Sequence, residues 1–129
     1  MSWLIYDYRD HRLENVVNSW LRGLQKPERI RMQKRIDLLR DNGHELCPGL
    51  AGPLKESRHL YKIRVNGRVA PRLLLCKGPI NMQTEYTLLL GAFETDDELP
   101  SGTVEAAEQN RLEIIADQER RCPHARVAP

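Results

Sequence analysis

Hydrophobic residues near the N-terminus recur with the period of an α-helix. Apolar side chains occupy positions i, i+3, i+4, i+7, i+8 and i+11 in the set Leu13, Val16, Val17, Trp20, Leu21 and Leu24. This spacing predicts an amphipathic helix over 13–24 whose apolar face, Trp20 included, lies in the core. Pro27 suits the first turn of a second helix, which Asn42-Gly43 can end. The two helices are expected to form a hairpin.

Four stretches before and after these two helices have the composition of β-strands, at 3–8, 60–65, 72–76 and 85–91. The second and third of these flank Asn66-Gly67, a dipeptide that favours a tight turn. A final helix is expected over about 103–119, because Glu105 and Glu108 stand near its positive N-terminal end.

The resulting order, β-α-α-β-β-β-α, predicts an α+β fold. We expect a small antiparallel sheet packed on one side against the N-terminal helical hairpin and the C-terminal helix. A single domain over 1–119 accounts for these elements. Residues 120–129 have no periodicity and are expected to form a flexible C-terminal tail.

The composition of the chain is that of a globular domain with a modest core: 129 residues, 40% hydrophobic and 29% charged. No run approaches 18 apolar residues and the start lacks the pattern of a secretory signal, so no membrane partner is expected. The three cysteines are odd in number and widely spaced. Such cysteines favour reduced thiols and a cytoplasmic location.

Charge is distributed unevenly along the chain. Residues 1–93 hold 16 Lys/Arg against nine Asp/Glu, whereas residues 94–129 hold four against nine. Within residues 55–77 there are seven bases and one acid, the bases being Lys55, Arg58, Lys62, Arg64, Arg68, Arg72 and Lys77. A basic patch this dense attracts polyanions such as RNA, although a solvated strand face has the same composition. The RNA-binding candidates are Lys55, Arg58, His59, Arg68 and Lys77.

Three of these cations are predicted to share one face of the sheet. Lys62 and Arg64 alternate with inward residues on one strand, and Arg72 begins the next strand. If the register brings Arg72 beside Arg64, the repulsion among the three requires a counter-anion, which a phosphate can supply. We expect the Arg72 guanidinium to lie outside the core.

These residues also carry a family resemblance. The segments are Pro53-Leu-Lys55, Leu60-Tyr-Lys-Ile-Arg-Val65, Arg72-Leu-Leu-Leu75 and Leu89-Leu-Gly-Ala-Phe93, with Leu39-Arg-Asp-Asn-Gly43 ending the helical hairpin. In their order and spacing, over roughly residues 3–115, the chain resembles the RelE/HigB-like toxins of bacterial type II toxin–antitoxin modules, and most of all their phage-derived branch. The resemblance implies a RelE/ParE-like fold.

The resemblance further implies ribosome-dependent cleavage of mRNA without a metal or other cofactor. In such toxins the 2′-hydroxyl attacks the adjacent phosphate and leaves a cyclic phosphate. Carried over by position, Lys62 matches a base or electrostatic stabiliser, Arg64 neutralises the phosphate, and Arg72 clamps the pentacoordinate state. The implied partners are the ribosome, mRNA and a cognate antitoxin of helix-turn-helix type.

The chain departs from the family after its last long strand. Family members place basic, His or Tyr residues there, whereas this chain has the acidic run Phe93-Glu-Thr-Asp-Asp97. Tyr61 and Tyr86 are therefore candidate supporting residues, along with Arg58 and His59. Two alternatives stay open: a non-nuclease ParE-like relative that binds a protein target such as DNA gyrase, and an inactive phage-derived domain.

Other chemistry has weaker support in the sequence. His44, Cys47, Cys122 and His124 could together make a Cys₂His₂ zinc site, but their spacing differs from that of zinc modules, so no metal site is expected. The acidic residues of 94–98 are expected to form a solvated loop.

Overall fold

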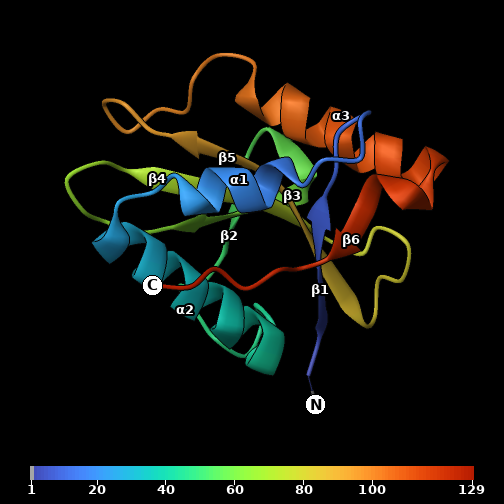
Figure 1. The fold of residues 1–129 in the computed structure, drawn as a ribbon, viewed down its shortest axis with the longest axis horizontal. Coiled ribbons are helices and arrows are strands. Elements are labelled where there is room, and N and C mark those ends of the chain that lie inside the picture. Colours follow the sequence, from blue (N-terminus) through green and yellow to red (C-terminus); the bar gives the residue numbers. More distant parts are fainter. Residues whose placement is uncertain (1) are drawn as a thin grey trace.

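A computed structural model describes residues 2–129. Its elements are β1 (Leu4–Tyr8), α1 (Val16–Arg22), α2 (Lys26–Asn42), β2 (Gly52–Leu54), β3 (Ser57–Arg64), β4 (Pro71–Lys77), β5 (Glu85–Phe93), α3 (Thr103–Ala116) and β6 (Arg121–Pro123). A short 3₁₀ turn over Gln118–Arg120 links α3 to β6. The fold is α+β, as the sequence predicts, with α-helices arranged around a central sheet (Figure 1). Within residues 2–129, no helix has both the length and the apolar character that crossing a membrane requires.

The sheet is mixed, and the expectation of an antiparallel sheet is wrong in one pairing. Its strand order is β2-β3-β4-β5-β1-β6. β2 to β5 form an antiparallel meander, but β1 pairs with β5 in parallel, Leu4 opposite Glu85. After β1 the chain passes through both N-terminal helices to the far edge of the sheet and then returns strand by strand. The last strand of that return runs in the same direction as β1.

Helices cover both faces of the sheet, contrary to the expectation of one covered face. Neighbouring residues on a strand point to opposite faces, and on β1 the two faces have different partners. Asp7 accepts a hydrogen bond from Asn15, the N-cap of α1, at 2.8 Å, whereas the Tyr8 hydroxyl donates to Glu113 of α3. Figure 1 shows α3 and α2 on either side of the strands. α1 and α2 therefore pack on one face and α3 on the other.

The first helix is shorter than its hydrophobic pattern predicts. It begins at Val16 because Asn15 caps it and Leu13 has a φ of 61°, which no helical residue adopts. Leu13 is consequently exposed instead of lying in the core. The predicted limits of α2 are confirmed, with Pro27 in its first turn and Gly43, at φ 74°, just after its end.

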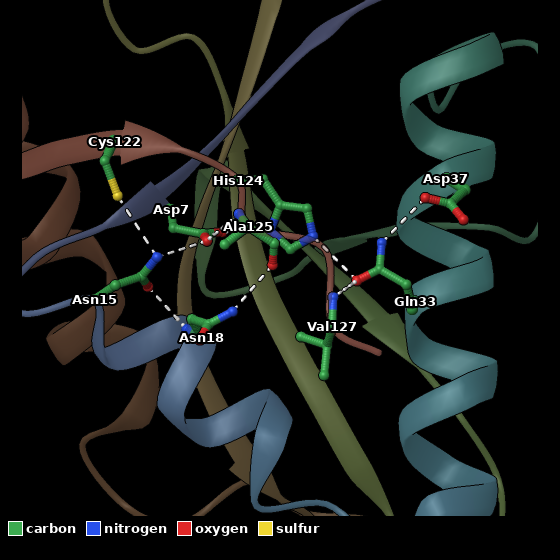
Figure 2. A network of polar contacts seen from close by, with 9 residues as sticks. All are labelled: Asp7, Asn15, Asn18, Gln33, Asp37, Cys122, His124, Ala125 and Val127. Carbon is green, nitrogen blue, oxygen red and sulfur yellow. Dashed lines mark hydrogen bonds and ion pairs between the residues drawn. The ribbon is translucent and has the colours of Figure 1, made fainter. Parts of the chain in front are cut away.

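Residues 121–127 belong to the folded domain, so the expectation of a flexible tail from residue 120 is wrong. β6 adds an antiparallel strand to β1, with Cys122 opposite Asp7. Beyond it, His124 inserts between two elements: Nδ1 lies 2.8 Å from Asp7 and Nε2 lies 3.2 Å from Gln33 of α2 (Figure 2). Val127 is buried, and its backbone N–H donates to Gln33.

Candidate functional site

The three candidate catalytic cations share one face of the sheet. In the β3–β4 register Arg64 lies opposite Arg72, which meets the condition stated for the cluster, and Lys62 lies opposite Leu74. Residues that are cross-strand partners project to the same face, and alternate residues along a strand do so too. The register therefore assembles Lys62, Arg64 and Arg72 on the face that also carries α3.

Glu94 supplies the counter-anion that this cluster requires. It directly follows β5, whose end pairs with the start of β4 through Phe93 and Pro71. Its carboxylate accepts a hydrogen bond from Lys62 Nζ at 2.9 Å and another from Arg72 Nε, and its side chain is only 7% exposed. The expectation that residues 94–98 form a solvated loop is thus wrong for Glu94.

The ion pairs set the charge state of Glu94. Its burial acts to raise the pKa of the carboxyl, but the hydrogen bonds from Lys62 and Arg72 and their positive charges outweigh burial and lower the pKa below its usual value. Glu94 is therefore ionised at neutral pH. The three side chains form a cation–anion–cation row in which one carboxylate contacts two positive charges and leaves a net charge of about +1.

Arg72 is a buried residue, and the expectation that its guanidinium leaves the core is wrong. The residue is 5% exposed. Besides Glu94, its Nη1 donates to the backbone oxygens of Val65 at 3.1 Å and Pro71 at 2.9 Å. These bonds cross the start of the β3–β4 hairpin, so Arg72 fixes both the hairpin and Glu94.

Lys62 and Arg64 face an open groove of about 840 Å³. The groove runs between the β2–β3 turn, the 94–102 loop and the first turn of α3, and Lys55 and Glu94 also line it. Arg64 is exposed, and none of the ion pairs within residues 2–129 involves it. A ligand in the groove can therefore reach the guanidinium of Arg64 directly, with Lys62 two residues away on the same strand.

The walls of the groove carry both signs of charge. The lining bases are Lys55, Lys62 and Arg64, and the lining acids are Glu56, Glu94, Asp97, Glu98 and Glu105. The bases lie on the β2–β3 side and on the sheet, while four of the five acids come from the segment that follows β5 and begins α3. The groove thus has a basic floor and an acidic wall.

The predicted RNA-binding residues are spread more widely than this floor. Lys55, Arg58, His59 and Arg68 are exposed, Lys55 at the groove and Arg68 in the β3–β4 turn. Lys77 lies at the far end of β4, where its Nζ stands 5.3 Å from the Trp3 ring centroid and 3.9 Å from Glu45. Lys77 therefore makes its contacts with Trp3 and Glu45, away from the groove.

The two tyrosines named as supporting residues lie on the opposite face of the sheet. Tyr61 pairs with Leu75, one residue out of phase with Lys62. His44 packs on Tyr61, with ring centroids 4.5 Å apart, and its Nδ1 lies 2.6 Å from the buried hydroxyl of Tyr86. Burial raises the pKa of Tyr86, which makes its hydroxyl a poorer acid. Tyr61 and Tyr86 do not join the cation cluster.

The four residues considered for zinc have separate surroundings. His44 contacts Tyr86, and His124 contacts Asp7 and Gln33. Across residues 2–129, no three His, Cys, Asp or Glu side chains gather as a metal site would require.

The residue that sequence reasoning missed is Glu94. Its position does hold a signal: Glu94 directly follows β5, and the end of β5 lies beside the start of β4, where Arg72 is. Recognising it required the pairing of β4 with β5. Comparison of the chain with protein-family models, with curated proteins and with solved structures found no match.

Proposed function

We propose that this chain is the toxin of a type II toxin–antitoxin module and inhibits translation by cleaving mRNA at the ribosome. The observation that carries the proposal is the β3–β4 register, which gathers Lys62, Arg64 and Arg72 on one face beside an open groove. The resemblance to RelE/HigB-like toxins rests on these same residues. The element order, with two helices after β1 and one after β5, makes the α+β fold that the proposal requires.

In this proposal the cations have unequal roles. Arg64 is exposed at the groove and binds the scissile phosphate, where its planar fork suits two phosphate oxygens. Lys62, with a side chain 23% exposed, stands next to that phosphate. Arg72 is a positioning residue, since its guanidinium donates hydrogen bonds to Glu94 and to two backbone oxygens.

The reaction needs no metal ion. The 2′-hydroxyl of one nucleotide attacks the adjacent phosphate, and a cyclic phosphate and a free 5′-hydroxyl result. Positioning and stabilisation of developing charge supply most of the acceleration for such a transfer. The proposed setting is the bacterial cytoplasm, where a cognate antitoxin of helix-turn-helix type holds the toxin inactive.

A second candidate function is a non-nuclease ParE-like toxin that binds a protein target such as DNA gyrase. The acids of the groove favour it: Glu94 is already paired with two of the three cations, and five acids line the groove against three bases. A surface with both signs of charge suits a protein partner better than a phosphate backbone. An inactive phage-derived domain is the third reading.

Induced expression in a bacterium separates these functions. The proposal predicts growth arrest, loss of intact message and new RNA ends that carry cyclic phosphates, and the Arg64→Ala variant should be much less toxic. Arrest with intact message and induced DNA damage would favour the gyrase-type function. Unimpaired growth with intact message would leave the inactive domain.

A further inference from the structure

Glu94 and Lys62 form an ion pair in the groove to which the proposed function assigns no chemistry. Lys62 Nζ and Glu94 Oε2 are 2.9 Å apart, and both residues line the groove in which Arg64 is exposed. Arg72, buried on the far side of Glu94, holds the other carboxylate oxygen. Arg72 thus fixes the pair from the buried side, and of the two groove-lining side chains Lys62 is 23% exposed and Glu94 only 7% exposed.

The contact decides which of the two groups can take a proton. An ammonium has three donors and no lone pair, so Lys62 in its ion pair cannot act as a base. An ionised carboxylate has lone pairs beyond those that two hydrogen bonds occupy. Glu94, not Lys62, is therefore the group in this cluster that can accept a proton at neutral pH.

We propose that Glu94 is the general base of the cleavage reaction and Lys62 its general acid. This inference rests on the proposed function and reverses the assignment of Lys62 as a base. Glu94 takes the proton of the attacking 2′-hydroxyl, and Lys62 gives a proton to the departing 5′-oxygen. Arg64 binds the phosphate beside this pair.

Glu94 and Lys62 together account for both protons that move in the reaction. The 2′-oxygen loses its proton to Glu94 and forms a bond to phosphorus, while the bond from phosphorus to the 5′-oxygen breaks and leaves its electron pair on that oxygen. The 5′-oxygen then carries the proton that Lys62 released. After cleavage Glu94 is protonated and Lys62 is neutral, and the proton returns from one to the other across their 2.9 Å contact.

Arg72 has a distinct part in this scheme. By holding Oε1 it fixes the carboxylate in one orientation and leaves Oε2 toward Lys62 and the groove. Its own position is fixed by the backbone oxygens of Val65 and Pro71. Such a preorganised base needs no rearrangement when substrate binds.

A substrate whose leaving group needs no general acid can distinguish the role of Lys62 from that of Glu94. Ribosome-bound mRNA is prepared with either the natural 5′-oxygen or a 5′-sulfur at the scissile linkage, and single-turnover rates are measured. Lys62→Met should slow the oxygen substrate by about 10²–10⁴-fold and recover most of the loss with sulfur. Glu94→Gln should be slow by a similar factor with both substrates, because the 2′-hydroxyl still needs a base.

Asp96→Asn is the matched control. Asp96 is exposed in the same acidic segment, lies outside the groove lining and has a φ of 53°, which Asn tolerates. This variant should cleave both substrates at the wild-type rate, so that loss of one negative charge is not the cause of the Glu94→Gln effect. Melting temperatures of all variants show whether each is folded.

The pH dependence of the wild-type protein tests the role of Glu94 without any substitution. With both the oxygen and the sulfur substrate the rate should fall on the acid side as Glu94, whose pKa is lowered by its contacts with Lys62 and Arg72, takes up its proton. Sulfur rescue of Glu94→Gln, or wild-type rates in that variant, would overturn the assignment. If the wild-type protein leaves both substrates intact, the proposed function itself has failed.

Discussion

Arg72 carries a positive charge in a place that water barely reaches. Its guanidinium contacts Glu94 and the backbone oxygens of Val65 and Pro71, and its side chain is only 6% exposed. Buried ion pairs add little net stability when intact, but removing one member leaves the other charged and unpaired. Arg72 is for this reason a structural residue as well as a neighbour of the groove.

We predict that Arg72→Ala lowers the free energy of unfolding by about 3–5 kcal/mol, the usual cost of breaking a buried pair. Arg68→Ala is the control, because Arg68 is exposed in the β3–β4 turn and its loss should change stability by about 0.5 kcal/mol or less. Denaturant unfolding measures both. Equal stability of the two variants would show that Arg72 is not held in the core.

Glu94 makes the stability of the protein depend on pH. Its pKa is lowered in the folded state, so its contribution is complete above the ordinary carboxyl pKa of about 4.3 and is lost as the pH falls through the folded value. We predict that Glu94→Gln is less stable than the wild type at pH 7 and that the difference shrinks below about pH 4. A difference that stays constant from pH 7 to pH 3 would contradict this, as thermal unfolding at each pH can show.

At the scale of elements, the C-terminal segment joins parts of the chain that are far apart in sequence. His124 contacts Asp7 of β1 and Gln33 of α2, and Asp7 is fully buried (Figure 2). Gln33 also donates to Asp37 one turn later on α2, at 3.0 Å. The segment thus ties the edge strand β6 to both the sheet and the helix.

We predict that His124→Ala lowers the free energy of unfolding by about 1.5–3 kcal/mol, because buried Asp7 loses a charge-assisted hydrogen bond. The control is Arg126→Ala. Arg126 also bonds across to α2, at Asp37, but its side chain is 59% exposed, so water screens the pair and its loss should change stability little. If His124→Ala is as mild as the control, or if removing residues 121–129 leaves stability unchanged, the segment is a loose tail after all.

Periodicity predicted most elements but not how they pair. Strands β1, β3, β4 and β5 and helices α2 and α3 follow from residue composition, alternation and end signals such as Pro27 and Gly43, whereas the short strands β2 and β6 do not. The parallel pairing of β1 with β5 depends on the path of the whole chain, which local patterns do not encode. β6 has three residues and is held by the long-range contacts of His124, so its sequence alone resembles a tail.

At the scale of the whole molecule, the candidate site was only partly predictable. Alternation along β3 placed Lys62 and Arg64 on one face, but the addition of Arg72 depended on a register that the sequence left open. Glu94 lies 22 residues after Arg72, and its role follows only from the pairing of β4 with β5. The burial of Arg72 was missed for the same reason, because the carboxylate that permits it belongs to the residue that follows another strand, β5.

The basic floor of the groove should make RNA binding depend on the salt concentration. RNA affinity should fall as salt rises, with a logarithmic slope of about −0.7 for each phosphate contacted. We predict that Arg64→Ala reduces the steepness of that slope by about one contact, since Arg64 is the exposed arginine of the floor. Titrations of single-stranded RNA at several salt concentrations give the slope, and a flat response in the wild type would mean that the floor does not bind phosphate.

The most direct test of the account is cleavage of a defined mRNA on purified ribosomes, with the RNA ends mapped chemically. The wild-type protein should cut the message and leave a 2′,3′-cyclic phosphate and a 5′-hydroxyl. Arg64→Ala, with an unchanged melting temperature, should cut about 10²–10³-fold more slowly, because a preorganised group at the developing charge is gone. A message left intact by the wild type, or cut equally fast by Arg64→Ala, would contradict the account.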